Sequence, residues 1–338
     1  MTTRQIGRTD LRVSAIGLGT AQFTGKGWIS AVIPTLPQHQ VDDIVRSALS
    51  GGITWFDSSE MYGGGTSERA LAAGLRAAGV SPGEVTVATK WKPLARTAKS
   101  IESTIGDRLD ALQPYPVDLH QIHLNRGSFS SVRAQMRAMA RLVQAGKIRA
   151  VGVSNFTTRQ MADAHDELAK YGISLASNEV KINLLDRRVE DNGMLDAAQR
   201  LGVTLLAYSA QQQGILTGKF HADRNLAQSV HPLRRKLMGL TPDSLDRSQP
   251  LIDVMREIAD SHQSTVGQIS LAWLMNHYGD TVIPIAGASK PHHAEGAAGA
   301  LTLHLSADEV EQLAKVSSRV LDPARTARWS RVRMPHRW

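Results

Sequence analysis

The sequence predicts a (β/α)8 TIM barrel with an N-terminal β-hairpin and a long loop after the seventh strand. Apolar runs of strand-like composition recur along the 338 residues, and segments with helical periodicity separate them. No G-x-G-x-x-G follows the first run, which argues against a doubly wound sheet, the competing fold, and such sheets usually have fewer strands. We therefore expect one barrel domain over residues 1–320 and a basic tail over residues 321–338.

A small hairpin is expected before the barrel. Between Arg4 and Val13, Gly7 and the pair Thr9-Asp10 interrupt short apolar stretches, a pattern typical of two strands joined by a turn. The predicted barrel strands then follow in order at residues 15–20, 53–57, 85–90, 117–123, 149–154, 173–180, 203–208 and 281–285.

Helical stripes of apolar residues lie between these strands. They comprise Val41, Ile44, Val45 and Leu49, then Leu71, Leu75 and Ala78, then Ile101, Ile105, Leu109 and Leu112, then Val132, Met136, Met139 and Val143. Glycines such as Gly51 and Gly202 come directly after helices and indicate where they end. This alternation of strand and helix indicates a parallel barrel.

The interval from residue 209 to residue 280 is too long for one helix. Arg247–His262 and Val266–His277 account for two helices, so residues 210–246 are expected to be largely irregular. A long irregular segment in a compact domain is usually functional. In barrels of this type a phosphate site commonly forms around the loops after strands seven and eight.

Composition excludes several classes of protein. The net charge is +8, but six Arg and one Asp between Arg319 and Trp338 contribute five of these charges, so the body is no basic nucleic-acid-binding surface. With no cysteine the chain has no disulfide, thiolate nucleophile or Cys-based zinc site, and its 12 histidines show no metal-ligand spacing. The N-terminus is polar, and no apolar run approaches the roughly 20 residues of a membrane helix. We expect a cytoplasmic protein without a metal.

Polar side chains stand at the ends of the predicted strands, where the active sites of such barrels lie. Asp57 follows strand two, Lys90 ends strand three and His123 ends strand four. Tyr62 lies just past Asp57, beside three glycines. An inward-facing charge is costly unless it is paired, so Asp57 and Lys90 are expected to neutralise each other beneath Tyr62. Taken singly, a histidine such as His123 is more often a satisfied core residue than a catalytic one.

In order and spacing, these segments resemble the aldo-keto reductase family, barrels that use a nicotinamide cofactor. The matching segments are Gly17–Thr20, Phe56-Asp57 through Tyr62-Gly63, Ala88–Lys90, Asp118–His123, Gly146–Arg149, Gly152–Phe156, Ala207–Ser209, Leu216–Lys219 and Ile283–Lys290. The resemblance spans residues 4 to about 318. Residues 173–187 and 284–301 resemble the branch that includes bacterial and plant reductases of the pyridoxal-reductase type.

The resemblance implies a catalytic tetrad of Asp57, Tyr62, Lys90 and His123. The implied reaction reduces an aldehyde or ketone to an alcohol with hydride from NADPH, with Tyr62 as the general acid. A phenol ordinarily titrates near 10, and we expect Lys90 to lower that pKa. Asp57 would hold Lys90, and His123 would donate a hydrogen bond to the substrate oxygen.

The resemblance also implies a set of cofactor-binding residues. Ser154, Asn155 and Glu179 match the residues that hold the nicotinamide carboxamide, and Tyr208 matches the ring that stacks on it. The other expected cofactor contacts are Gly19, Thr20, Asp57, Ser209, Gln211, Gly214, Leu216, Gly218, Lys219, Ile285, Gly287, Ser289, Lys290 and His293. Ser289 and Lys290 match the segment that receives the 2′-phosphate, which favours NADP(H) over NAD(H).

Three departures from the family pattern stand out. Glu179 replaces the usual Gln, and an ionised carboxylate cannot donate to the carboxamide oxygen. We expect Lys181, on the same strand face, to pair with Glu179; an unpaired Glu179 would favour the oxidised cationic nicotinamide. Residues 210–214 differ in the loop that covers the pyrophosphate, and His293 lies in a segment with fewer adenine contacts than is common.

Substrate residues are the least readable part of the sequence. We expect Trp28, Trp91 and Arg126 to line the pocket, Trp91 above all because it follows Lys90; Ile29, Phe129, Trp329 and Trp338 are further candidates. The substrate is expected to be a small carbonyl compound, and the protein a monomer or homo-oligomer with no nucleic-acid or membrane partner. The alternatives are a dehydrogenase of an aldose or another alcohol, a nucleotide-sensing regulatory β subunit of a potassium channel, and a phosphate-binding barrel isomerase.

Overall fold

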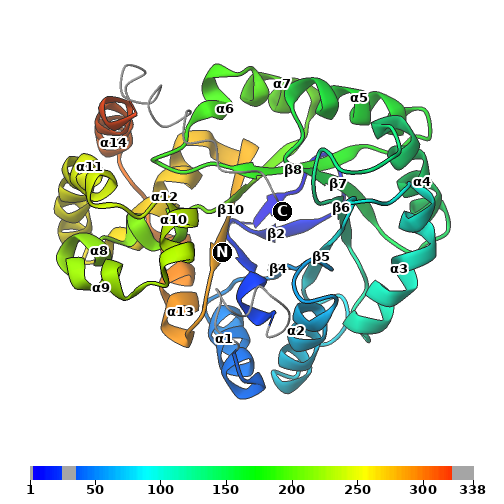
Figure 1. The fold of residues 1–338 in the computed structure, drawn as a ribbon, viewed down its shortest axis with the longest axis horizontal. Helices are drawn as coiled ribbons and strands as arrows, with labels where there is room; N and C mark the ends of the chain where they lie inside the picture. Colours follow the sequence, from blue (N-terminus) through cyan, green and yellow to red (C-terminus); the bar gives the residue numbers. More distant parts are fainter. Residues whose placement is uncertain (1–2, 25–35, 322–338) are drawn as a thin grey trace.

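The computed structural model describes residues 3–24 and 36–321. Its central feature is a closed barrel of parallel strands in the order β10-β3-β4-β5-β6-β7-β8-β9, with helices around the outside (Figure 1). The barrel strands are β3 (Gly17–Gly19), β4 (Trp55–Asp57), β5 (Thr86–Trp91), β6 (Leu119–Ile122), β7 (Ala150–Ser154), β8 (Leu175–Lys181), β9 (Thr204–Tyr208) and β10 (Val282–Gly287). Each overlaps the run predicted for it, which confirms the fold class.

The helices of the barrel wall follow the predicted stripes. They are α1 (Gln38–Ser50), α2 (Thr66–Ala77), α3 (Lys99–Leu112), α4 (Val132–Gln144), α5 (Thr158–Ala169), α6 (Arg188–Asp191), α7 (Met194–Leu201), α12 (Val266–Tyr278), α13 (Pro291–Gly299) and α14 (Ala307–Val320), with short 3-10 turns at Ala21–Phe23, Gly279–Thr281 and Ala300–Thr302. None of the helices in the described part of the chain is both long and apolar enough to cross a membrane.

The predicted hairpin closes the N-terminal end of the barrel. Strands β1 (Thr3–Gln5) and β2 (Arg12–Ser14) pair antiparallel. Ile6, Leu11 and Val13 form one buried cluster with inward-facing barrel residues, which are Trp55, Ala88, Leu119, Ala150, Ala176, Leu206, Ile283 and Ile285. Gly17 makes room for Trp55, because a Cβ there would lie 2.1 Å from the indole Cε2. The half of the barrel interior nearest the N-terminal ends of the strands is therefore apolar.

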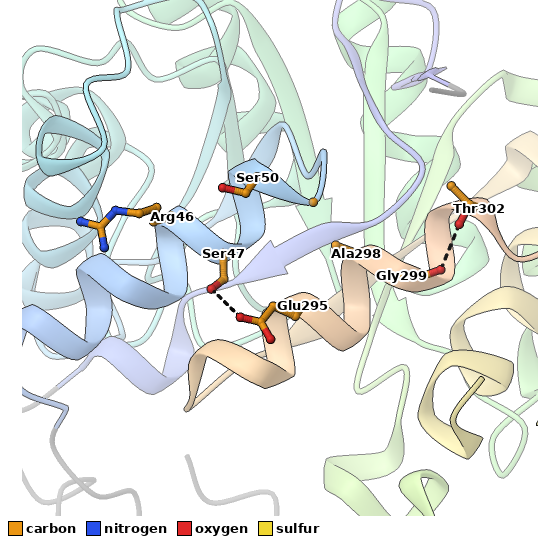
Figure 2. A pocket seen from close by; sticks show the side chains of 8 residues that line it. Arg46, Ser47, Ser50, Glu295, Ala298, Gly299 and Thr302 are labelled. Atoms are coloured by element: carbon orange, nitrogen blue, oxygen red, sulfur yellow. Dashed lines mark hydrogen bonds between the residues drawn. The ribbon is translucent and has the colours of Figure 1, made fainter. Parts of the chain in front are cut away.

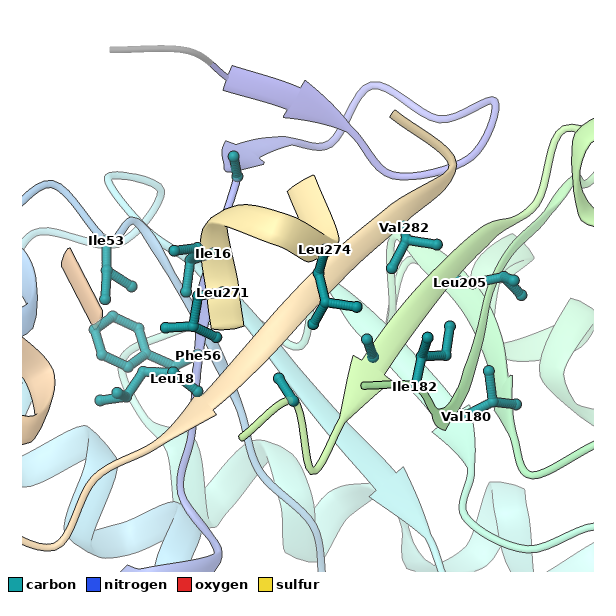
Figure 3. Close-up of a cluster of buried hydrophobic side chains, with 14 of the residues drawn as sticks. Ile16, Leu18, Ile53, Phe56, Val180, Ile182, Leu205, Leu271, Leu274 and Val282 are labelled. Atoms are coloured by element: carbon teal, nitrogen blue, oxygen red, sulfur yellow. The ribbon is translucent and has the colours of Figure 1, made fainter. Parts of the chain in front are cut away.

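A larger core lies between the strands and the helices. Parallel strands covered on both faces are apolar on both, and Leu18 and Phe56 accordingly face outward against α12 (Figure 3). Leu271 and Leu274 of α12 complete this layer, and Val282 lies beside them. Because Phe56 points outward, its neighbours Trp55 and Asp57 point into the barrel.

The long connection after β9 is present but differs from its expected form. Residues 210–246 are not largely irregular: they contain η3 (Gln212–Thr217), α8 (Lys219–Ala222), α9 (Arg224–Ser229) and α10 (Pro232–Met238), and α11 runs over Pro242–Ser261 rather than beginning at Arg247. A separate apolar cluster holds this segment together, formed by Ile215, Phe220, Ala227, Met238, Leu240 and Leu245. The segment is thus a small helical layer beside the barrel (Figure 1).

Candidate active site

A polar layer lies above the apolar half of the barrel interior, toward the C-terminal ends of the strands. Because alternate strand residues share a face, Asp57 points inward two positions after Trp55, and Lys90 two positions after Ala88. Gln121 of β6 is the register partner of Lys90, and Glu179 of β8 is the register partner of Ser154. This layer is the candidate active site.

Lys90 is the centre of this layer and is fully buried. Its Nζ donates to Asp57 Oδ2 and to the carbonyl oxygen of Ser58 at 3.1 Å, and lies 3.2 Å from Glu179 Oε2. Burial by itself lowers the pKa of Lys90, but the charges of Asp57 and Glu179 outweigh it and raise the pKa above its ordinary value. Lys90 is therefore an ammonium, and the predicted pair with Asp57 is present.

The expected pairing of Glu179 with Lys181 is wrong. Glu179 pairs with Lys90, three strands away around the barrel, while Lys181 Nζ lies 3.6 Å from Asp186 Oδ2 in the loop beyond β8. Lys181 stands at the very end of its strand and so reaches the loop, whereas Glu179 lies deeper and reaches the barrel interior. Glu179 is therefore an ion-pair partner of Lys90 in the polar layer.

Gln121 joins both carboxylates, a role that the sequence analysis missed. Its Nε2 lies 3.2 Å from Asp57 Oδ1 and 3.1 Å from Glu179 Oε2, and its Oε1 accepts from Ser177 Oγ at 3.1 Å. Gly152 leaves room for this arrangement, because a Cβ there would lie 2.4 Å from Ser177 Oγ. One signal was available: Gln121 precedes His123 by two positions and so shares its strand face.

Tyr62 lies over Lys90 on the loop between β4 and α2. The centroid of its ring is 5.4 Å from Lys90 Nζ and 5.7 Å from the centroid of the His123 ring, which it meets edge-on. Burial raises the pKa of Tyr62 and Lys90 lowers it, and burial prevails. The expected lowering by Lys90 is present, but burial outweighs it, so the phenol is protonated at neutral pH and Lys90 offsets part of the cost of ionising it.

His123 is held by Ser59, a second residue that the sequence analysis missed. The Nδ1 atom of His123 lies 2.7 Å from Ser59 Oγ, which also accepts from the Met61 N–H at 3.0 Å. A hydroxyl has one hydrogen to give, and when Ser59 gives it to Nδ1 the ring hydrogen sits on Nε2. Burial and the charge of Lys90 lower the pKa of His123, so the ring is neutral.

The residues expected around a nicotinamide carboxamide lie together on β7, β8 and β9. Ser154 Oγ donates to the carbonyl oxygen of Glu179 at 3.0 Å, and Asn155 Nδ2 donates to Ser154 Oγ at 3.0 Å. Asn155 has a positive φ of 59° and its Oδ1 accepts from the Tyr208 hydroxyl at 2.9 Å. Amide, hydroxyl and ring therefore form one connected group beside Lys90.

The residues expected around a phosphate also meet. Lys219 of α8, Arg234 of α10 and Lys290 before α13 are close enough that burial and then the other two cations lower the pKa of Lys219. Burial, His292, Lys219 and Lys290 lower the pKa of His293 to about 4. Ser289 Oγ lies 3.4 Å from His293 Nδ1. Mutually repelling cations of this kind suit a bound anion.

Thr20 and Leu216 are the most deeply buried of the expected cofactor contacts. Thr20 is fully buried, because its hydroxyl bonds to the carbonyl oxygen of Asp57 and to Ser67 Oγ. Leu216 is fully buried because it packs in the main core. In this structure the side chains of both residues contact protein groups. The remaining candidates stand at the mouth of β3 and β10 or on the connection after β9, namely Gly19, Gly287, Ser209, Gln211, Gly214 and Gly218, with Ile285 inside the barrel.

The substrate-pocket prediction for Trp91 is wrong. Trp91 is 1% exposed, and its Nε1 donates to Ser100 Oγ of α3 at 3.1 Å. Since Lys90 points into the barrel, the next residue must point outward. Arg126 is exposed on the loop after β6, which also carries Phe129, while Trp28 and the other three aromatic and aliphatic candidates at 29, 329 and 338 lie outside the described residues.

Arg96 connects the loop that carries Tyr62 with the loop that carries Phe129. Its Nη1 donates to Glu60 Oε1 at 2.7 Å, and Glu60 lies two positions before Tyr62. Its carbonyl oxygen accepts from Phe129 N at 2.9 Å and from Ser128 Oγ at 3.0 Å. Three loops at the barrel mouth are therefore joined through one arginine.

A groove on the outer wall is separate from this layer. It encloses about 550 Å³ between α1 and α13 (Figure 2), and is lined by Arg46, Ser47, Ser50, Gly51, Glu295, Ala298, Gly299 and Thr302. Ser47 Oγ and Glu295 Oε1 are 3.1 Å apart across it. No residue of the polar layer lines it. Within residues 3–24 and 36–321, no group of three or more metal-ligating His, Asp or Glu side chains occurs.

Comparison with known proteins agrees with this geometry. The chain is 29% identical over 318 residues to chloroplastic pyridoxal reductase of Arabidopsis thaliana, covering 90% of this chain and 83% of the relative. A glycerol dehydrogenase from Gluconobacter oxydans superposes with a TM-score of 0.80 at 27% identity, covering 95% and 97% of the two chains. An aldo/keto reductase from Klebsiella pneumoniae, solved with NADP and acetate, superposes with a TM-score of 0.70 at 26% identity, covering 93% and 95%. The sequence model of the aldo/keto reductase family matches residues 15–318, and the chain belongs to that family.

Proposed function

We propose that this protein is an oxidoreductase that reduces an aldehyde or ketone to an alcohol with NADPH, and that Tyr62 is the general acid. The observation that carries the proposal is the meeting of Tyr62, Lys90, Asp57 and His123 at the barrel mouth. A protonated phenol above a buried ammonium, next to a neutral imidazole with a free N–H, is a donor set suited to a carbonyl oxygen that gains negative charge.

The described residues fit an NADP cofactor. Ser154, Asn155 and Tyr208 form a connected polar group with one aromatic face beside Lys90. The cations Lys219, Arg234 and Lys290 repel one another, and an anionic phosphate would relieve that repulsion. An enzyme of 26% identity was solved with NADP, and another solved structure of a Klebsiella pneumoniae enzyme holds NADPH. We assign Lys219 and Lys290 to the phosphate and Asn155 and Tyr208 to the nicotinamide.

The mechanism follows from what each side chain can hold or give. When bound, NADPH supplies a hydride to the carbonyl carbon. Tyr62 holds its proton at Oη and gives it to the carbonyl oxygen, which leaves a phenolate. Lys90 stabilises that phenolate, and Asp57 keeps Lys90 in place by accepting its hydrogen bond. His123 presents Nε2–H to the same oxygen because Ser59 occupies its Nδ1.

The same side chains run the reaction in either direction. In alcohol oxidation the Tyr62 phenolate would take the proton, so direction depends on pH and on the ratio of oxidised to reduced cofactor. The Gluconobacter oxydans neighbour is named a glycerol dehydrogenase, but that name does not assign the direction of oxidation to this protein. We propose reduction as the working direction because the structure favours a protonated Tyr62. The comparisons reported above bring no support for the regulatory-subunit alternative.

The proposed substrate is a small carbonyl compound, with pyridoxal as the first compound to test because a relative of 29% identity is named pyridoxal reductase. The loop after β6 carries Arg126 and Phe129, and Phe129 is 79% exposed, so this loop can contact a substrate at the mouth. Trp91 takes no part. A cytoplasmic location and a monomeric or homo-oligomeric state stay proposals.

The test is NADPH oxidation with a panel of small aldehydes and pyridoxal, comparing the wild type with Tyr62→Phe. Loss of a general acid costs about 10²–10⁴-fold in kcat, so we expect turnover by the wild type that the variant loses. Tyr171→Phe, an exposed tyrosine after α5, is the matched control and should keep full activity. Equal turnover by wild type and Tyr62→Phe would remove Tyr62 from the reaction, and no turnover by the wild type on any compound would contradict the proposed function.

A further inference from the structure

Two buried carboxylates share one ammonium inside the barrel. Asp57 is 2% exposed, Glu179 is 4% exposed and Lys90 is 0% exposed. The ion pairs that the structure shows for both carboxylates end on Lys90 Nζ. With every group ionised, the three side chains carry a net charge of minus one in a site shielded from water, which is costly.

Gln121 holds the two carboxylates in one assembly. Its Nε2 lies within hydrogen-bonding distance of Asp57 Oδ1 and Glu179 Oε2, one amide hydrogen for each. Ser177 Oγ donates to Gln121 Oε1, and this settles which end of the amide faces the carboxylates. The assembly is therefore built from four strands, β4, β5, β6 and β8.

A β-bulge turns Glu179 into the barrel. The pairing of β7 with β8 slips between Val151 and Gly152, so that Gly152 is opposite Ser177 although Val151 is opposite Leu175. The slip changes the alternation: Ala176 belongs to the interior apolar cluster, and Ser177 faces inward as well. Bulges next to active sites commonly re-aim a side chain in this way. Without this bulge Glu179 would face the helices.

The charges of this assembly shift the pKa values of two nearby tyrosines, Tyr62 and Tyr208. Burial and then the charges of Asp57 and Glu179 raise the pKa of Tyr62, against the influence of Lys90. Burial and then the charge of Glu179 raise the pKa of Tyr208 to about 12. The titratable or charged groups that face Glu179 are Asp57 on β4, Tyr62 on the following loop, Lys90 on β5, and Tyr208 on β9, with His123 facing Lys90 and Lys181 turned to Asp186.

We propose that Glu179 is a positioning residue that acts through Lys90: its charge keeps one exchangeable proton on Asp57, and the loss of that proton weakens the support that Lys90 gives to the Tyr62 phenolate. This inference rests on the proposed function, because it concerns how readily Tyr62 gives up its proton. With the proton present, only one negative charge offsets the positive charge of Lys90. Once the proton is lost, two negative charges offset the positive charge of Lys90. The phenolate that Tyr62 becomes after donating its proton is then less stable.

The environment of Asp57 agrees with this assignment. Burial and the charge of Glu179 raise the pKa of Asp57 to about 7, against the influence of Lys90. Carbonyl reduction is therefore expected to slow as the pH rises through neutrality. The extra negative charge above neutral pH also favours an oxidised, cationic nicotinamide over a neutral reduced one.

The experiment compares the wild type with Glu179→Gln, which keeps the shape and removes one carboxylate. We measure kcat for carbonyl reduction against pH, and the ratio of the dissociation constants for NADP⁺ and NADPH by tryptophan fluorescence. The fall in kcat near neutral pH should disappear in Glu179→Gln. The ratio of the two dissociation constants should shift toward NADPH by about tenfold, as expected for the removal of one nearby charge. Glu102→Gln, a surface carboxylate paired with Arg141, changes the net charge equally and should alter neither.

A measurement without turnover keeps the test independent of the proposed function. Carboxyl ¹³C NMR of the wild type, labelled in aspartate and glutamate, should show one buried carboxyl titrating near neutral pH, and Glu179→Gln should abolish that transition. If neither protein turns over but this transition is present, the proposed function fails and the proton on Asp57 stands. If no carboxyl titrates near neutral pH, or if Glu179→Gln leaves both the pH profile and the binding ratio unchanged, the assignment of Glu179 is overturned.

Discussion

Ser59 Oγ lies 2.7 Å from Nδ1 of His123, and this contact fixes the Nδ1 side of the ring against the loop after β4. In Ser59→Ala the ring can place its hydrogen on either nitrogen. The lost hydrogen bond is worth about 1 kcal/mol, so we expect kcat to fall roughly fivefold while KM changes little. Ser59→Thr keeps the hydroxyl and should retain most of the activity. Nitrogen-15 NMR of His123 reports the tautomer directly, and an unchanged tautomer in Ser59→Ala would contradict this prediction.

Lys90→Met should destabilise the fold because it leaves Asp57 and Glu179 buried without a cation. Removing one partner of a buried ion pair typically costs about 3–5 kcal/mol in the free energy of unfolding, which denaturant unfolding measures. The loss should shrink at acid pH, where protonation neutralises the carboxyl groups. Adding Asp57→Asn and Glu179→Gln to Lys90→Met should recover part of the stability, and no recovery would show that packing, not charge, is responsible.

Gly152→Ala should impair catalysis by displacing Gln121 and Ser177. The new Cβ would lie 2.4 Å from Ser177 Oγ and 2.9 Å from Gln121 Cγ, closer than real side chains allow. We expect a loss of stability of about 1–3 kcal/mol and a lower kcat. Gly106→Ala on α3 is the control: its Cβ meets no atom within 4 Å, so helix propensity should stabilise the protein by roughly 0.5–1 kcal/mol. Equal kinetics for the two variants would remove Gly152 from the support of the site.

Glu190→Gln should destabilise the protein at neutral pH and much less in acid. Although burial opposes it, hydrogen bonds from His277, Arg187 and Tyr278 lower the pKa of Glu190 from 4.5 to about 2. A lowered carboxyl pKa stabilises the folded state above the unfolded value and the benefit is lost as the pH falls toward the folded one. We expect a difference of roughly 2 kcal/mol at neutral pH that declines below pH 4.5.

Thermal unfolding of wild type and Glu190→Gln across pH measures this difference. Glu257→Gln changes an exposed carboxylate on α11 and serves as the control, with no expected pH-dependent difference. If the gap between wild type and Glu190→Gln stays constant from neutral to acid pH, the hydrogen bonds to His277 and Tyr278 do not depend on the charge of Glu190.

Sequence alone predicted the barrel because its strands are buried on both faces and recur with helices between them. The ends of those strands also pointed to Asp57, Lys90 and His123, since barrel chemistry gathers there. The short helices after β9 escaped prediction because pieces such as Lys219–Ala222 are too short to show periodicity. Trp91 was a misreading that strand alternation could have prevented: once Lys90 is inside, Trp91 is outside.

The pairing of Glu179 could not be predicted, because it depends on two features that single-strand patterns do not contain. The first is the closure of the barrel, which brings β8 opposite β5. The second is the slipped register between Val151 and Gly152, which decides the direction of Glu179. Ser59 and Gln121 are likewise visible as residues on the right loop and strand face, but their partners follow only from coordinates.

The arginine that joins the mouth loops has a practical consequence for engineering. Because Arg96 bonds to Glu60 on one side and to Ser128 Oγ and Phe129 N on the other, the loop after β6 and the loop that carries Tyr62 cannot be redesigned separately. Grafting a foreign segment after β6 to accept another carbonyl compound would transmit its backbone shift to Tyr62. We expect grafts that preserve the two hydrogen bonds to the Arg96 carbonyl oxygen to change the substrate range without lowering kcat.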